Sequence, residues 1–171
     1  MVKDCVKVVC ITAVGGITAI LIYPLLHEVG HAAAAAFFGG AVKEIHVFPE
    51  AYVVCDMSDA GIFGKIAVGL GGMLLPFFLS AVAGPKKFWG WYVCFITRGV
   101  CMLSFGISSV AVMMFHFGRE MENEDIVQVL RSEPALVWFC FVGALVLLAC
   151  DMILVVRSHP IRQFSDYFEV A

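Results

Sequence analysis

The hydrophobic residues of this chain gather into four long blocks that are separated by short polar or glycine-containing stretches. The blocks span about residues 8–38, 62–83, 88–117 and 135–156. Each block reaches the roughly 20 residues that a helix needs to cross a bilayer. Because a helix satisfies its own backbone hydrogen bonds in lipid, the pattern predicts an all-α membrane protein with about four transmembrane helices.

The connections between the blocks predict smaller elements. Gly39 and Gly40 are expected to end the first helix, since glycine readily takes the left-handed conformation that closes a helix. Residues 41–49 alternate in part and are rich in β-branched side chains, which predicts a short edge strand or hairpin at the membrane surface. Between the third and fourth blocks, residues 125–130 have the spacing of a short amphipathic helix.

Composition agrees with a multi-pass integral membrane protein in a lipid bilayer. Hydrophobic residues make up 61% of the 171 residues and charged residues 15%, whereas soluble domains carry about 25% charged residues. The net charge of −3 comes without a basic run, so we expect no nucleic-acid partner. The sequence shows no repeat and no room for a second soluble domain, which predicts that residues 1–171 form a single transmembrane domain.

The N-terminal residues and the cysteines each have an alternative reading. Lys3 and Lys7 precede an apolar stretch, as in a signal peptide. A histidine pair follows inside the same block, however, and cleavage there would remove it, so we expect a retained span.

The seven cysteines include no Cys-x-x-Cys pair, and most lie in apolar stretches, so we expect neither a disulfide framework nor a cysteine zinc site.

Near the end of the first block the sequence reads His27-Glu28-Val29-Gly30-His31. Residues four apart on a helix share one face, so both imidazoles can reach a single ion. Neutral imidazole binds zinc at about 2.0–2.1 Å. Ionisable side chains inside a membrane segment are costly and mark functional sites by default, although the pattern alone is often chance in a soluble helix. We therefore predict a zinc site, the alternative being simple hydrogen bonding at the membrane interface.

The glutamate of this motif predicts a hydrolytic reaction. Zinc lowers the pKa of a bound water toward about 7. Glu28 lies about 100° round the helix from His27, where it can approach this water without binding the metal. We expect Glu28 to act as general base and acid, taking the proton of the zinc-bound water and delivering it to the leaving amine. Pro24 can kink the helix one turn earlier and help to admit water.

These residues resemble the site-2 protease family of intramembrane zinc metalloproteases. The match is specific over residues 25–32, Leu-Leu-His-Glu-Val-Gly-His-Ala, and the turn at 39–42 with the strand after it resembles the family's edge hairpin. Residues 71–76 are a loose counterpart of a Gly-Pro-containing span. The resemblance implies a three-helix catalytic core and a transmembrane protein as substrate, cleaved in or near its membrane segment. The chain lacks a regulatory domain, so substrate selection is expected to rest on the core or on a regulatory membrane partner.

The third zinc ligand is predicted to be Asp125. Catalytic zinc sites commonly have three protein ligands and a water. With four spans, the first span ends on the same side as the loop that contains Asp125, whereas Asp151 should lie most of a membrane thickness away. Residues 123–130 resemble the family's Asp-containing segment, although Ile126 replaces the usual glycine and the Asn-Pro…Asp-Gly motif is absent as such. The alternative ligands are Glu122, Glu124, His46 and His116.

The edge strand predicts how a substrate is held. A transmembrane substrate must unwind locally, because the peptide bonds of a helix are inaccessible, and an extended segment can pair with a strand edge. Val42, Ile45 and Val47 are the residues expected to contact it. The equal alternative is that the strand is a plain connection.

Two other functions compete with an intramembrane zinc endopeptidase using one zinc ion per chain. A non-proteolytic membrane binding or regulatory protein would retain the fold and the metal, but it would not need Glu28. A small transporter would use Arg98 and Asp151 as coupling charges, but four spans without a repeat make it a weak reading. We expect Arg98 and Asp151 to pair across the bundle instead.

Orientation in the membrane stays open. With four spans, the termini and the turn at 84–87 share the side with more cations, which favours cytoplasmic termini. Members of the resembling family usually place their zinc nearer the cytosol, which favours the opposite orientation.

Overall fold

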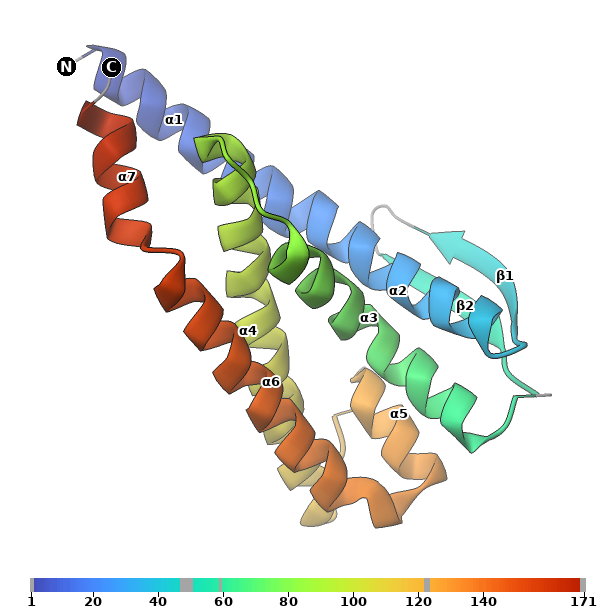
Figure 1. Cartoon of the computed structure of the whole chain (residues 1–171). Helices are drawn as coiled ribbons and strands as arrows, with labels where there is room; N and C mark the ends of the chain where they lie inside the picture. Colours follow the sequence, from blue (N-terminus) through green and yellow to red (C-terminus); the bar gives the residue numbers. More distant parts are fainter. Residues whose placement is uncertain (1, 47–50, 59, 122–123, 170–171) are drawn as a thin grey trace.

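The computed structural model describes residues 2–46, 51–58, 60–121 and 124–169. Figure 1 shows long helices running roughly side by side, with a hairpin at one end and both termini at the other. The elements in chain order are α1 (Val2–Ile17), a π-helical turn (Thr18–Ile22), α2 (Tyr23–Phe37), β1 (Ala41–His46), β2 (Tyr52–Asp56), α3 (Ile62–Val82), α4 (Phe88–His116), α5 (Asp125–Ser132), a 3₁₀ turn (Pro134–Leu136), α6 (Val137–Arg157) and α7 (Pro160–Glu169).

The predicted all-α membrane fold with a hairpin after its first long helix is confirmed. Four helices in the described part of the chain are long and apolar enough to cross a membrane, and they span Val2–Phe37, Ile62–Val82, Phe88–His116 and Pro134–Glu169. The last of these continues past the predicted end of the fourth block, because the polar tail folds into the amphipathic helix α7. Its aromatic side chains stack on the beginning of α4, with the rings of Tyr167 and Phe88 3.9 Å apart.

The first long helix passes through Pro24 without ending. Proline has no N–H to donate to the preceding turn. The turn immediately before it, Thr18–Ile22, takes up this irregularity as a π-helical segment, a feature often found near functional sites. The helix ends at Phe37, and Gly39 follows in the left-handed conformation with φ +80°, as the sequence predicts.

Close packing of α2 against α3 depends on glycine. A side-chain carbon on Gly30 would overlap the backbone oxygen of Gly71, and one on Gly71 would lie 3.0 Å from the backbone carbonyl carbon of Gly30. The two backbones can approach this closely because neither residue has a side chain. This contact sets the distance between the histidine-bearing helix and α3.

The short helix α5 is held in place by its apolar face. Ile126, Val127 and Leu130 are almost completely buried against residues of α4 and α6, including Val112 and Cys140. This burial fixes the orientation of α5, and Asp125 is its first residue. In Figure 1 α5 lies between α3 and the pair formed by α4 and α6.

Arg98 and Asp151 interact electrostatically, but they do not form the direct pair that the sequence predicts. Arg98 donates through Nη2 to the carbonyl of Ser80 at 2.6 Å and through Nη1 to that of Leu154 at 3.3 Å. These carbonyls lie in the last turns of α3 and α6, and that of Leu154 also accepts the backbone N–H of Ser158 at 3.1 Å. Asp151 is fully buried, and no described residue forms a hydrogen bond with its carboxylate.

Candidate metal centre

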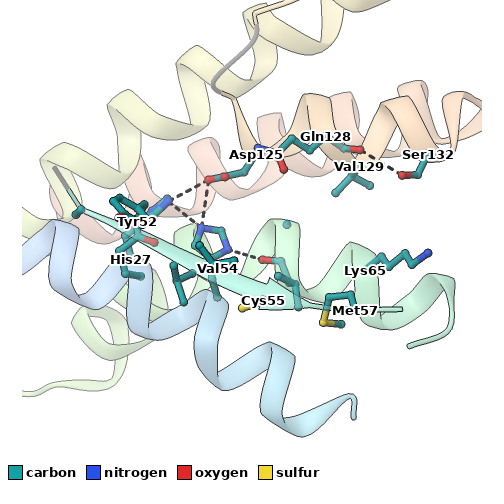
Figure 2. Close-up of a pocket in the computed structure, with 16 residues that line it drawn as sticks. His27, Tyr52, Val54, Cys55, Met57, Lys65, Asp125, Gln128, Val129 and Ser132 are labelled. Atoms are coloured by element: carbon teal, nitrogen blue, oxygen red, sulfur yellow. Dashed lines mark hydrogen bonds and ion pairs between the residues drawn. The ribbon is translucent and has the colours of Figure 1, made fainter. Parts of the chain in front are cut away.

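Two histidines of α2 and the first residue of α5 converge on one point. Figure 2 shows the side chains of His27 and Asp125 directed toward each other. His27 Nε2 lies 3.0 Å from Asp125 Oδ2, and His31 Nε2 lies 3.3 Å from the same oxygen. The two Nε2 atoms are 3.1 Å apart. Three atoms that can bind a metal therefore form a nearly equilateral triangle.

The size of this triangle fits a zinc ion. Tetrahedral zinc with bonds of about 2.0–2.1 Å separates neighbouring ligand atoms by ~3.3 Å. The three measured separations lie at or just below this value. Within the described residues, these three side chains are the one group of histidine, cysteine and acidic ligands close enough to hold an ion together.

The hydrogen bond of His31 to α3 orients its free nitrogen toward the triangle. His31 Nδ1 lies 2.6 Å from the carbonyl oxygen of Val68. A carbonyl only accepts, so Nδ1 carries a proton, and Nε2 is the ring nitrogen that faces the triangle and would bind a metal after losing any proton that it carries. Metal-binding histidines are typically oriented by such a bond from their second nitrogen.

Gly72 of α3 leaves room for the two imidazoles. A side-chain carbon at this position would lie 2.6 Å from His27 Nε2 and would overlap His31 Nε2. Any other residue would therefore push into the triangle. The sequence shows Gly71 and Gly72 within the segment 71–76, which only loosely resembles the family's Gly-Pro-containing span. Nothing in that segment alone predicts that Gly72 makes room for the imidazoles.

Electrostatics favour Asp125 as an ionised ligand. Burial alone raises its pKa, but hydrogen bonds and attraction from His27 and His31 outweigh burial and hold the pKa well below the usual range for aspartate. The carboxylate is therefore negatively charged at neutral pH. It supplies the hard anionic oxygen that complements two imidazoles in zinc sites.

Glu124 does not point to the triangle. Its carboxylate accepts a hydrogen bond from the buried hydroxyl of Ser108 in α4. Burial raises the pKa of Glu124, and the Ser108 bond only partly opposes this. The backbone carbonyl of Glu124 accepts from Val127 at 3.0 Å, which starts α5. The Ser108 contact thus ties the beginning of α5, and with it Asp125, to α4.

The other alternative ligands have different surroundings. His46 of β1 stacks on Tyr52 at 5.0 Å between ring centroids, and His116 packs against Trp138 at 5.2 Å. Asp151 lies buried within α6 and is not part of the group. Glu122 lies outside the described residues.

A cavity of about 820 Å³ opens over the triangle. Its walls come from α2, β2, α3 and α5, and Figure 2 shows the strand β2 crossing in front of His27. Glu28 also lines this cavity, and its buried carboxyl group lies near the Val53 backbone. Glu28 and the three possible ligands therefore face the same space.

The strand that borders this cavity is not the one expected. Val42 and Ile45 lie on β1, which pairs antiparallel with β2, and neither residue lines the cavity. Residues 51–55, most of them in β2, line it instead, because β2 lies between β1 and the triangle. Val47, the third expected substrate contact, lies outside the described residues.

No family model, curated protein or solved structure matches this chain. The fold and the site define a class on their own: an all-α membrane protein whose first long helix and short α5 bring two histidines and an aspartate together. The buried carboxyl of Glu28 lies at the same cavity.

Proposed function

We propose that this protein is an integral membrane zinc endopeptidase that hydrolyses a peptide bond in or near the membrane segment of a transmembrane substrate. The observation that carries the proposal is the triangle of His27, His31 and Asp125 beside the carboxyl group of Glu28. The resemblance of residues 25–32 to the site-2 protease family supports the same function.

The two Nε2 atoms and Asp125 Oδ2 would hold one zinc ion per chain. Bound zinc supplies Lewis acidity, which lowers the pKa of water and polarises the carbonyl of the scissile bond. His31 keeps its ring orientation through the bond to Val68.

Glu28 moves the protons of the reaction. Its carboxylate takes one proton from the attacking water as the oxygen bonds to the carbonyl carbon. The C–N bond then breaks, and Glu28 gives the proton to the departing amine. The nearby backbone of Val53 keeps the Glu28 carboxylate turned toward the cavity.

The strand β2 offers an edge to an unwound substrate. Within the described part of the chain, β1 pairs with one edge of β2. The other edge of β2 has no paired strand among the described residues and faces the cavity that contains Glu28. An extended peptide can add to such an edge through backbone hydrogen bonds. This places a scissile bond beside Glu28. Substrate choice then rests on the walls of this cavity or on a regulatory membrane partner.

The test compares wild type with Glu28→Gln, both purified in detergent. We expect both proteins to bind one zinc ion per chain, because glutamine at this position removes no ligand. Only wild type should cleave members of a panel of single-span substrates. Glu44→Gln, on the exposed strand β1, is the matched control and should cleave like wild type. Cleavage by Glu28→Gln at the wild-type rate would overturn the mechanism.

A further inference from the structure

A second cavity, of about 160 Å³, lies at the opposite end of the bundle from the triangle. It is formed by the connection between α3 and α4, the beginning of α4 and the end of α6. Pro85, Trp91, Arg98 and Ser158 are among its lining residues. Its volume exceeds severalfold the roughly 30 Å³ that one water molecule occupies in the liquid.

Two buried donors at this cavity lack acceptors. Trp91 and Arg98 are 8% and 9% exposed. No described residue accepts the hydrogen bond of Trp91 Nε1–H or of Arg98 Nε–H. Arg98 is held in place, since its other two nitrogens bind the carbonyls of Ser80 and Leu154. Buried polar groups without partners are rare, and both of these groups can only donate, so their natural partner is a ligand that only accepts.

Three exposed cations are next to lining residues of this cavity in the sequence. Lys86 and Lys87 follow Pro85, Arg157 precedes Ser158, and all three cations are exposed. No described acidic residue forms an ion pair with any of them. Asp151 lies one turn deeper on α6 than Leu154 and does not line the cavity. Asp151 interacts electrostatically with Arg98 from outside the cavity, so an anion in the cavity would share this guanidinium with the Asp151 carboxyl group.

Aromatic and basic side chains lie around this cavity, as they do at a membrane–water interface. Around it, the beginning of α4 and the helix α7 form an aromatic cluster that includes Trp89, Tyr92 and Tyr167. Lys7 reaches across to the carbonyls of Tyr167 and Phe168. Tryptophan, tyrosine and lysine gather at the membrane–water interface, and basic pockets between helices at this level bind phospholipid headgroups.

We propose that this cavity binds the phosphate group of a membrane phospholipid. Trp91 Nε1 and Arg98 Nε donate to phosphate oxygens, and Lys86, Lys87 and Arg157 attract the negative charge. The acyl chains follow the apolar surfaces of α4 and α6 into the bilayer. This site is independent of the proposed protease activity.

The test measures phospholipid bound to the purified, delipidated full-length protein by native mass spectrometry. Phosphatidylglycerol, phosphatidylcholine and inorganic phosphate are titrated separately. We expect wild type to bind one phospholipid per chain, with phosphatidylglycerol favoured and inorganic phosphate a weak competitor. Trp91→Phe keeps the ring and removes one hydrogen bond, so it should weaken binding about fivefold.

Two further variants complete the test. The triple variant Lys86→Gln, Lys87→Gln, Arg157→Gln should weaken phosphatidylglycerol binding more than phosphatidylcholine binding, because it removes the three exposed cations. Trp138→Phe, at the other end of the bundle, is the matched control and should bind like wild type. Arg98 is left unchanged because it also joins α3 to α6. Equal lipid binding by wild type, Trp91→Phe and the triple variant, or tight binding of inorganic phosphate alone, would overturn the proposal.

Discussion

The two ends of the helix bundle bury polar side chains of opposite character. At the end with the hairpin, the Nε2 atoms of His27 and His31 converge with Asp125 Oδ2, and the Nδ1–H of His31 orients its ring by donating to the carbonyl of Val68. At the other end, Trp91 and Arg98 bring N–H groups together with exposed cations around them. Converging lone pairs are stabilised by a cation, and converging N–H groups by an acceptor. The partner of a buried polar cluster can therefore be inferred from whether its converging atoms are acceptors or donors.

The largest expected effect follows from removal of a histidine. His27→Ala or His31→Ala should lower zinc affinity by more than about 100-fold, since even changes next to metal ligands cost about 10–100-fold. Zinc content after dialysis measures this directly. His116→Ala, which removes an imidazole packed on Trp138, should keep full zinc content. Wild-type zinc content in both of the first two variants would place the metal elsewhere.

The next comparison concerns the acidic ligand. Asp125→Ala should lose zinc and cleavage, whereas Asp151→Ala should keep both, provided that each variant folds. The reason is that Asp125 Oδ2 completes the triangle, while Asp151 lies buried elsewhere in α6. Zinc titration and substrate cleavage are measured on both proteins. If the Asp151 variant fails to bind zinc while the Asp125 variant binds it normally, the ligand assignment is incorrect.

A smaller effect should follow from filling the space beside the imidazoles. Gly72→Ala places a methyl group against His27 and His31 and should weaken zinc binding about tenfold or more, because crowding in a packed site costs free energy. Gly99→Ala on α4 meets nothing within 4 Å and serves as the control. Thermal unfolding is measured beside zinc affinity. Equal zinc affinities for the two variants would show that α3 does not confine the site.

The smallest effect should come from Ser108. Ser108→Ala removes the hydroxyl that ties Glu124 to α4 and should weaken zinc binding about fivefold, the value of one hydrogen bond. Ser109→Ala is the matched control, since the Ser109 hydroxyl donates to the Phe105 carbonyl within its own helix and to no other described residue. Zinc titration separates the two. An equal loss in both variants would mean that the Ser108 contact does not position Asp125.

The features that follow from local pattern could be predicted from the sequence. The long apolar blocks, the left-handed Gly39 and the short helix starting at Asp125 are fixed by neighbouring residues, so the structure confirms them. The placing of Asp125 beside the histidines came from span topology and a resemblance, and the structure brings the three side chains together.

The features that depend on which elements pack together could not be predicted. The strand β2 borders the cavity because of its place beside β1, and nothing in residues 51–55 alone indicates this. Gly72 matters only because α3 lies against the histidines. Arg98 binds the carbonyls of Ser80 and Leu154, and the ends of α3 and α6 come together there only in the folded bundle.

The central claim is that zinc bound by His27, His31 and Asp125 serves a reaction in which Glu28 moves protons. Zinc X-ray absorption of wild type and Glu28→Gln, measured together with substrate cleavage, tests it most directly. We expect the same spectrum for both proteins, with two imidazole nitrogens at about 2.0–2.1 Å and oxygen ligands beside them, and cleavage by wild type alone. A spectrum without two imidazole ligands, or undiminished cleavage by Glu28→Gln, would contradict it.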